Sequence, residues 1–383
     1  IKVKISPNKF AVNRADALIK IISCTFLFIL FLNFSARAQN YNWITPNQTY
    51  LKMYVVNDGM YRIDKNDFIN AGILVSSINP MTVKVYYKGN QIPIYFFGED
   101  NASFDDGDYF DFHGQRNYGG ITRSYDITNN VVYTTDEYFD LYSDTSVYYV
   151  AWGGAFGLRY NNYNTVALTN YPNDFYYEKI HFEQDLNYSL GQNISTNDFG
   201  YFNNEKYIGE GWYWRVLQTS NFIDQAFSVN SLPTALLQCR LKIFAYPGNK
   251  NTSIFNEHRL ALKINATQLD TLYRDNYNRF DTIIYFSSST LFNGNNTIRV
   301  LNRPATGFAG IINFDMAEVS YPREFLFNDN FLSFKSEISD TAAKIFRIRS
   351  YVPSLPLFIY DNKNNYRIPN FTFSSDTLIF SGK

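Results

Sequence analysis

Short stretches of alternating aromatic and β-branched residues, separated by turns rich in Asn, Gly and Asp, follow one another along almost the whole sequence. Aromatic residues make up 19% of the 383 residues, with 35 Phe and 32 Tyr. These residue types favour strands, and an apolar period of two indicates a half-buried strand. No long stretch carries the 3.6-residue apolar period of an amphipathic helix. The sequence therefore predicts an all-β protein.

Charge and hydrophobicity narrow the classes of function. Hydrophobic residues make up 45% of the chain and charged residues 18%, which is enough apolar surface for buried cores. The formal net charge is −1. Proteins that bind nucleic acid usually carry clustered excess Lys and Arg that pair with phosphates. Because this chain has no such excess, we expect no nucleic-acid partner.

The first 38 residues have the pattern of a secretory signal peptide. An apolar run, Ile21–Phe34, is followed by the small-x-small site Ala36-Arg37-Ala38. Five basic residues precede the run: Lys2, Lys4, Lys9, Arg14 and Lys20. The run is short for a membrane span. We predict export to the periplasm, outer-membrane surface or medium, with cleavage before Gln39 and no span afterwards; the alternative is an uncleaved anchor. The initial Ile1 and the long basic region suggest an upstream or truncated reading frame.

The mature chain divides into an N-terminal β-rich domain over 39–156, a Gly- and Asn-rich linker over 157–170 and a β-sandwich over 171–325. In the first domain, Asn57-Asp58-Gly59 and Lys88-Gly89-Asn90 are hairpin turns, and Asp64 caps a short helix that ends at Gly72. The predicted strands are Leu51–Val56, Met60–Ile63, Val83–Tyr87, Gln91–Phe96, Tyr109–Phe112 and Ser146–Trp152.

The second domain contains eight strand-like segments in about 150 residues, which predicts a two-sheet, jelly-roll-like sandwich closed by Pro322-Arg323. A further β-rich segment is predicted over 326–383. The strands of the sandwich are predicted at Phe175–Phe182, Gly211–Leu217, Ala226–Val229, Leu236–Tyr246, Arg259–Ala266, Asp281–Phe286, Thr297–Leu301 and Phe314–Tyr321.

Cysteine and histidine give no support for catalysis. Cys24 leaves with the signal peptide, and Cys239 shares strand parity with apolar neighbours, which predicts a core position. His113, His181 and His258 do not lie at metal-ligand spacing, and no Gly-x-Ser-x-Gly is present. We therefore assign no catalytic, cofactor-binding or metal-binding residue, and expect no cofactor.

Two segments keep alternatives open. The acidic stretch Glu99–Asp108 offers carboxylates around a Gly turn, which suits Ca²⁺, but its spacing does not match an EF-hand loop and the plainer interpretation is a solvated turn. The aromatics Trp212, Tyr213 and Trp214 could stack on sugars, but in a Phe- and Tyr-rich sandwich such residues usually belong to the core.

Several motifs, in their order and spacing, resemble the N-terminal region of the gingipain-like cysteine peptidases of Bacteroidetes, the group that includes the type IX secretion system sortase. The resemblance covers nearly the whole mature chain. It rests on Asp58–Ile63 (DGMYRI), Lys88–Ile94 (KGNQIPI), Phe104–Gly114 (FDDGDYFDFHG), Leu141–Tyr149 (LYSDTSVYY), His258 with Leu262–Asn265 (LKIN), Gly294–Ile298 (GNNTI) and Val319–Arg323 (VSYPR).

In that family a caspase-like α/β domain with a His and a Cys nucleophile follows this region, and no residue here can be carried over as catalytic. The resemblance implies a non-catalytic accessory region whose partners are a downstream catalytic domain and protein substrates or secretion-system components. The full-length parent would be a cysteine peptidase. The alternatives are a stand-alone adhesin or carbohydrate-binding sandwich, and a hydrolase using paired carboxylates.

Overall fold

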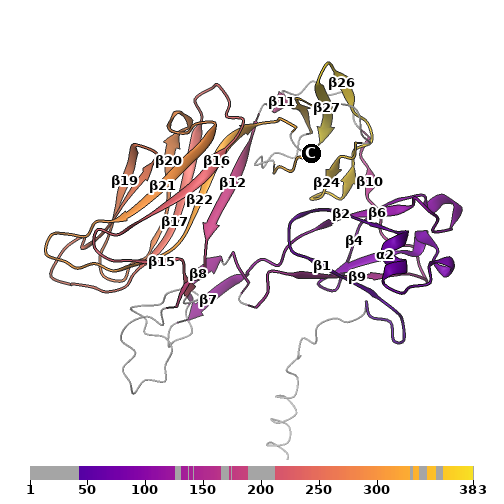
Figure 1. The fold of residues 1–383 in the computed structure, drawn as a ribbon, viewed down its shortest axis with the longest axis horizontal. Coiled ribbons are helices and arrows are strands. Elements are labelled where there is room, and N and C mark those ends of the chain that lie inside the picture. Colours follow the sequence, from indigo (N-terminus) through magenta and orange to yellow (C-terminus); the bar gives the residue numbers. More distant parts are fainter. Residues whose placement is uncertain are drawn as a thin grey trace, which may run out of the picture.

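The computed structural model describes residues 43–125, 131–136, 138–140, 142–164, 172–173, 175–188, 212–327, 331–335, 343–350 and 357–382. The predicted signal peptide, residues 1–38, lies outside them. Strands make up 51% of the structure and helices contribute almost nothing, which confirms the all-β prediction. Figure 1 shows three β units: an N-terminal domain in indigo and purple, a sandwich in pink and orange, and a small yellow C-terminal unit. Within these residues, no helix is both long and apolar enough to cross a bilayer.

The N-terminal domain contains two antiparallel sheets and one short helix around an aromatic core that includes Phe68, Phe110 and Tyr148. The first sheet has the order β1 (Leu51–Val55), β9 (Ser146–Ala151), β3 (Lys84–Tyr87) and β4 (Asn90–Ile92). The second has the order β2 (Gly59–Asp64), β6 (Tyr109–Gly114) and β5 (Tyr95–Phe97), and the helix is α2 (Lys65–Asn70).

One of the two predicted hairpins is confirmed and the other is wrong. β3 and β4 pair around Lys88 and Gly89, whose φ angles of 47° and 81° suit the tight turn of a hairpin. The strands that flank Asn57-Asp58-Gly59 do not pair: β1 pairs with β9, and β2 pairs with β6. The Asp58 carboxylate accepts hydrogen bonds from the Arg116 backbone N–H and the Tyr118 hydroxyl. The turn therefore passes the chain from one sheet to the other.

Local signals explain two further details of this domain. Asp64 caps α2 as predicted, and Asp67 completes a capping box by accepting from the Asp64 backbone N–H. The predicted strand Gln91–Phe96 is two strands in different sheets, because Pro93 between them has no N–H to donate to a ladder.

The sandwich consists of two sheets that share one hydrophobic core. One sheet has the order β12 (Phe175–Glu183), β22 (Ile312–Glu324), β17 (Gln238–Pro247) and β20 (Phe280–Ser287), and β15 (Arg215–Leu217) also pairs with β22. The other has the order β16 (Phe222–Val229), β21 (Gly294–Asn302), β18 (His258–Ile264) and β19 (Thr267–Arg274). Fully buried side chains from both, among them Leu241, Phe280 and Leu260, form the core.

Three expectations for the sandwich strands require correction. The sequence gives no prediction for β19, because as an edge strand it keeps half of its side chains exposed and buries only Leu272. The predicted strand Gly211–Leu217 is divided: β14 (Trp212–Tyr213) pairs with β13 (Asn187–Tyr188), and β15 pairs with β22. Finally, β22 does not stop at Pro322. Its pairing with β17 ends at Ser320, while its pairing with β12 continues through Pro322 to Glu324. Pro322 therefore lies where β22 has a paired strand on one side alone, the position in a sheet that tolerates proline.

The C-terminal unit contacts both larger units. Its strands β24 (Tyr360–Asp361) and β25 (Tyr366–Arg367) form a sheet with β10 (Asn161–Asn162). Four other strands form its second sheet, in the order β11 (Pro172–Asn173), β23 (Lys344–Ile348), β27 (Thr377–Gly382) and β26 (Thr372–Ser374). Its core, which includes Phe346 and Phe380, also takes in Tyr176 and Phe325 next to the sandwich. Residues 157–164, assigned to the linker from sequence, pair with this unit through β10.

A hairpin of the N-terminal domain, β7 (Ile121–Tyr125) and β8 (Val131–Asp136), extends towards the sandwich (Figure 1). Just beyond it, the Tyr138 ring stacks on His181 of β12, with ring centroids 3.8 Å apart. The N-terminal domain therefore touches the sandwich at this point as well as through the C-terminal unit.

Candidate functional site

Cys239 lies in the sandwich core, as its strand parity predicted. The side chain is fully buried on β17, opposite Phe286 of β20. Burial raises the pKa of the Cys239 thiol to about 12. A nucleophilic cysteine needs a lowered pKa and access to substrate, so this thiol has the opposite of both properties.

The thiol of Cys239 should react slowly in the native protein. In protein beginning at Gln39, where Cys239 is the remaining cysteine, we expect labelling by a thiol reagent to be at least about a hundredfold faster in denaturant than in buffer at pH 8, because only opening of the core exposes a thiolate. Mass spectrometry over time measures the two rates. Native labelling as fast as that of a free thiol would contradict the core position.

The described histidines cannot serve Cys239. His181 on β12 lies in register with Glu318 and then Lys242, on the face of the sheet opposite to Cys239. His258 begins β18 beyond the far end of β17, on the order of 25 Å of strand away. His113 belongs to the N-terminal domain. Among the described residues, no three His, Cys, Asp or Glu side chains converge to hold a metal ion.

His181 forms a charged cluster on the outer face of the sandwich. Its Nε2 lies 2.6 Å from the Glu183 carboxylate, and its Nδ1 lies 3.9 Å from that of Glu318. Burial alone would lower the pKa of His181, but the hydrogen bonds and charges of the two glutamates outweigh it and raise the pKa above its ordinary value. The imidazolium in turn lowers the pKa of Glu318.

The raised pKa of His181 predicts a pH dependence of stability. The contribution of the protonated form is fully present below the unfolded pKa of about 6.5, and it is lost as the pH rises through the higher folded value. We therefore expect His181→Gln to flatten the fall in stability of the sandwich above pH 6.5. NMR titration of the imidazole and unfolding curves at several pH values measure both effects. A folded pKa below 6.5, or parallel stability curves, would show that the glutamates do not control this histidine.

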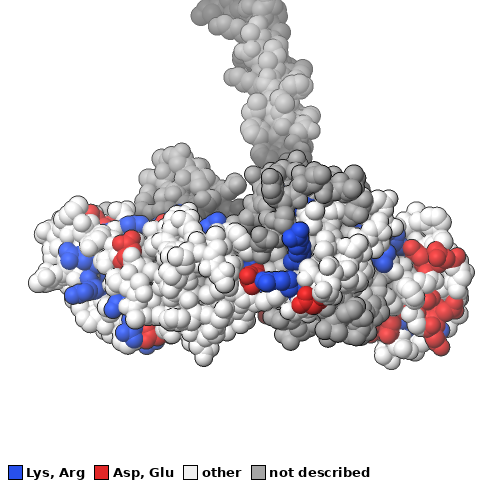
Figure 2. Space-filling view, turned by 90° about the horizontal axis from the view of Figure 1, so that it is seen from above, with Lys and Arg blue, Asp and Glu red and all other residues white. Residues whose placement is uncertain are grey.

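The acidic stretch Glu99–Asp108 lies at the end of the N-terminal domain, where carboxylates gather near α2 (Figure 2, right). Most of its charges have protein partners. Glu99 is paired with Arg159, Asp106 with Lys65 at 2.9 Å, and Asp105 accepts from Asn101 and Ser103. This arrangement explains the loop without a cation, and calcium binding there remains a prediction.

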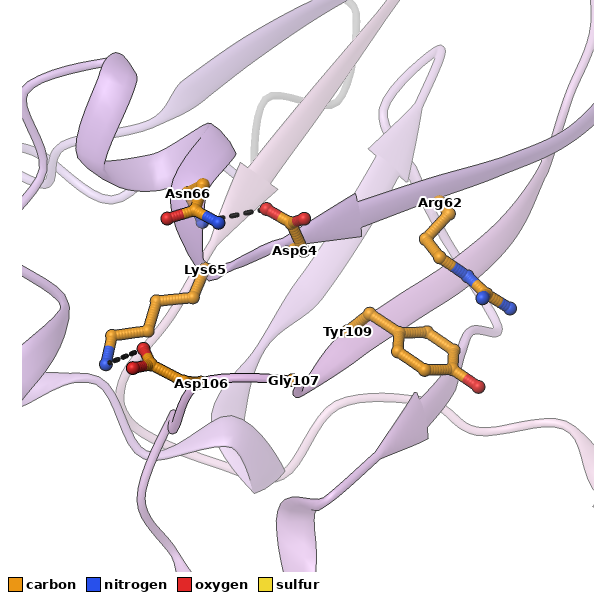
Figure 3. Close-up of a pocket in the computed structure, with 7 residues that line it drawn as sticks. All are labelled: Arg62, Asp64, Lys65, Asn66, Asp106, Gly107 and Tyr109. Carbon is orange, nitrogen blue, oxygen red and sulfur yellow. Dashed lines mark hydrogen bonds and ion pairs between the residues drawn. The ribbon is translucent and has the colours of Figure 1, made fainter.

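A shallow polar pocket opens between this loop and α2 (Figure 3). It is lined by Arg62, Asp64, Lys65, Asn66, Asp106, Gly107 and Tyr109. The Asp64 carboxylate caps the helix, the Lys65 ammonium pairs with Asp106, and the Arg62 guanidinium pairs with Asp111 on β6. Since these groups bind one another, the pocket presents no constellation that would select a ligand.

The aromatic triplet does not form a platform for sugars. Tyr213 and Trp214 are buried, and Trp214 packs against Phe314 in the core. Only Trp212 reaches the surface, where its ring lies beside Tyr188. Tyr213 and Trp214, two of the three residues on which the glycan-binding alternative rested, are therefore buried and cannot stack on a sugar.

The residues with the strongest functional interest join the N-terminal domain to the C-terminal unit. Asp111 on β6 is buried, and its carboxylate accepts two hydrogen bonds from Arg62 at 2.8 and 2.9 Å. The Tyr360 hydroxyl of β24 donates to the same carboxylate at 3.3 Å. Burial, followed by the Asp111 charge, raises the pKa of Tyr360. We call Arg62, Asp111, Phe358, Tyr360 and Arg367 the junction.

Stacked rings and backbone hydrogen bonds complete the junction. The guanidinium of Arg62 lies 3.6 Å from the centre of the Tyr109 ring, and that of Arg367 lies 4.3 Å from the Tyr95 ring. The Asn161 backbone N–H donates to Asn365. Sequence reasoning missed this site, because Arg62 and Asp111 meet only through the register of β2 with β6.

The fold places the chain in a class of all-β proteins in which a two-sheet sandwich is joined to smaller β domains. A particular solved structure shares it: dimeric latent PorU from Porphyromonas gingivalis, with a TM-score of 0.60 and 14% identity. The similarity covers 87% of this chain and 30% of PorU, so the chain spans less than a third of that protein. At this identity the match shows the fold alone.

Other matches are much weaker. A β-porphyranase of glycoside hydrolase family 86 from Bacteroides plebeius matches with a TM-score of 0.22 and 9% identity, over 73% of this chain and 35% of the enzyme. The infectious bursal disease virus VP2 subviral particle matches with a TM-score of 0.22 and 8% identity, over 72% of each chain. Neither supports an argument about fold or function. No family model and no curated protein sequence matches the chain.

Proposed function

We propose that this chain is the non-catalytic N-terminal region of an exported gingipain-like peptidase or type IX secretion sortase-like protein. PorU is a type IX secretion sortase of the gingipain-like group. The observation that carries the proposal is the fold shared with part of PorU over 87% of the chain. The motifs Asp58–Ile63 and Phe104–Gly114, found independently in the sequence, support the same group.

The role we propose is to present or dock a catalytic domain and its protein substrates. The junction and the stacking of Tyr138 on His181 hold the three β units in contact. A scaffold of this kind offers broad sandwich surfaces and loops, which suit protein partners better than a small-molecule pocket does. The signal-peptide pattern over 1–38 supports a location in the periplasm, at the outer-membrane surface or outside the cell.

The downstream reading frame tests the proposal directly. We expect it to encode an α/β domain that contains a His and a Cys nucleophile. Pulse-labelling and mass spectrometry of the exported product should then find the 39–382 region and that domain on one polypeptide. A stop codon directly after Lys383, or a downstream region without a nucleophile, would contradict the proposal and favour a stand-alone surface protein.

The isolated region should not cleave peptide bonds. Acyl transfer through a thiol requires a thiolate, a base and an oxyanion site, and the buried Cys239 has no histidine beside it. We expect no turnover of a fluorogenic peptide library, including substrates cleaved after Arg or Lys, with or without reductant and Ca²⁺. Cys239→Ala is the matched control. Reductant-dependent cleavage that this substitution abolishes would overturn the non-catalytic assignment.

A further inference from the structure

A buried carboxylate with an unused oxygen lies at one end of the sandwich. Glu257 directly precedes β18 and has 0% exposure. Its Oε1 accepts from the Asn276 backbone N–H at 2.6 Å and, at 3.5 Å, from that of Asn251. Its Oε2 is buried and has no hydrogen-bond partner among the residues that the structure describes. Buried carboxylate oxygens are nearly always satisfied, so this one requires an explanation.

A second carboxylate lies across from the first. His258 pairs with Arg274 in the ladder of β18 and β19, so Glu257 and Asp275 occupy the next opposed positions. Each carboxylate accepts a hydrogen bond from the backbone N–H of a residue next to the other one: Asn276 donates to Glu257, and Asn256 donates to Asp275. Like charges at directly opposed strand positions repel each other, and more strongly where they are buried.

Two neighbouring arginines are directed elsewhere, and the Lys250 ammonium of the same loop lies 5.2 Å from the centre of the Tyr277 ring. The Arg259 Nε donates to the Asn256 carbonyl, and the Arg274 guanidinium donates to the Arg279 carbonyl and the Thr282 hydroxyl. Within the described part of the chain, neither Glu257 nor Asp275 forms an ion pair. Glu257 is fully buried and Asp275 is partly buried. A buried carboxylate without a cation is costly, because its charge lacks compensation.

We propose that Glu257 and Asp275 bind a calcium ion between the β17–β18 loop and the β19–β20 turn. Ca²⁺ takes six to eight oxygen ligands and accepts carboxylates together with main-chain and Asn carbonyls. The loop 248–257 (GNKNTSIFNE) and the turn 275–279 (DNYNR) contribute main-chain carbonyls and the side chains of Asn256, Asn276 and Asn278. The side-chain oxygens of Asn249 and Asn251 already accept from Ile311 and Ser253. Zinc is disfavoured, because it prefers nitrogen and sulfur ligands and the two acidic side chains and the main chain here offer oxygen.

The ion would tie three loops together. Two of these loops carry the carboxylates, and the third is the segment after β21. Its Ala305 N–H donates to the Glu257 carbonyl, and the Asn249 side chain bonds to Ala309 and Ile311 in the same segment. Calcium would therefore stabilise one end of the sandwich without touching the junction.

Calcium titration of the full chain tests the proposal. Isothermal titration calorimetry with CaCl₂ should give one site, and the melting temperature should rise with Ca²⁺ and fall back with EDTA. Glu257→Gln and Asp275→Asn should each weaken binding at least about tenfold. Tb³⁺ should bind competitively and show luminescence sensitised by Tyr277, which lies in the same turn. Asp106→Asn, in the acidic stretch of the N-terminal domain, is the matched control and should bind Ca²⁺ like the wild type.

Several outcomes would overturn the site. One is that the folded wild-type chain binds no Ca²⁺ by calorimetry; another is that both variants bind it with wild-type affinity. Loss of binding in Asp106→Asn alone would place the ion in the acidic stretch. If Glu257→Gln does not fold, Asp275→Asn decides, because Asp275 is only partly buried and its amide can still accept from Asn256.

Discussion

Phe280→Ala should lower the free energy of unfolding of the sandwich by about 3–5 kcal/mol. Phe280 begins β20, is fully buried and belongs to the core shared by the two sheets. The substitution removes apolar surface from that core and leaves a cavity that the rigid strands around it cannot fill. Denaturant unfolding followed by tryptophan fluorescence, which includes the core residue Trp214, measures the change.

Phe292→Ala is the matched control for this prediction. Phe292 lies before β21 and is 60% exposed, so its truncation should change stability by no more than about 0.5 kcal/mol. Equal effects of the two substitutions would mean that the core is not packed as described. A small effect of Phe280→Ala alone would mean that the neighbouring strands close over the cavity.

Arg62→Ala should weaken the contact between the N-terminal domain and the C-terminal unit, and lower the free energy of unfolding by about 2–3 kcal/mol. The Asp111 side chain is 7% exposed and would lose its two charge-assisted hydrogen bonds, which leaves a buried charge without its cation. We place the cost below that of a fully buried pair because the Arg62 side chain is itself 49% exposed. Hydrogen exchange should become faster at β24 and β25, while exchange in the sandwich stays unchanged.

The pair Arg299–Asp224 provides the control for Arg62. It has the same bidentate geometry and also stacks on an aromatic ring, that of Phe222, but both of its side chains are more than a third exposed. Arg299→Ala should therefore cost less than about 1 kcal/mol. Arg62→Lys should be intermediate, because an ammonium keeps the charge and loses the fork. If Arg62→Ala costs no more than Arg299→Ala and leaves exchange at β24 unchanged, the junction does not hold the units together.

If the results for Phe280→Ala and Arg62→Ala are as expected, the chain consists of a tightly packed sandwich and an N-terminal domain that the C-terminal unit holds in place. In the proposed parent protein, such a connection would fix where the scaffold presents the domain that follows. Substitutions at the junction would then change function without unfolding the sandwich. The core and the junction are thus separable by experiment.

Local sequence chemistry determined the elements that depend on nearby residues. The Lys88-Gly89 turn was predictable because Gly supplies the positive φ that a tight hairpin needs, and the cap of α2 because Asp favours the position before a helix. The core position of Cys239 followed from alternation with Leu241 and Ile243, since a strand places every second residue on the same face.

Pairing between distant strands was decided only by the tertiary structure. Asn57-Asp58-Gly59 has the sequence of a hairpin turn, yet Asp58 binds Arg116 and Tyr118, and the flanking strands join different sheets. β19 was not predictable, because a strand at the edge of a sheet can carry many polar side chains, as Thr267–Arg274 does.

The same limit applies to the sites. Arg62 and Asp111 are 49 positions apart and Tyr360 is 249 positions beyond Asp111, while Glu257 and Asp275 meet across a ladder. A sequence specifies which residues can form a strand and which face is apolar. Register and contacts between domains depend on the total burial and hydrogen bonding of the assembled chain, and so these charges came together only in three dimensions.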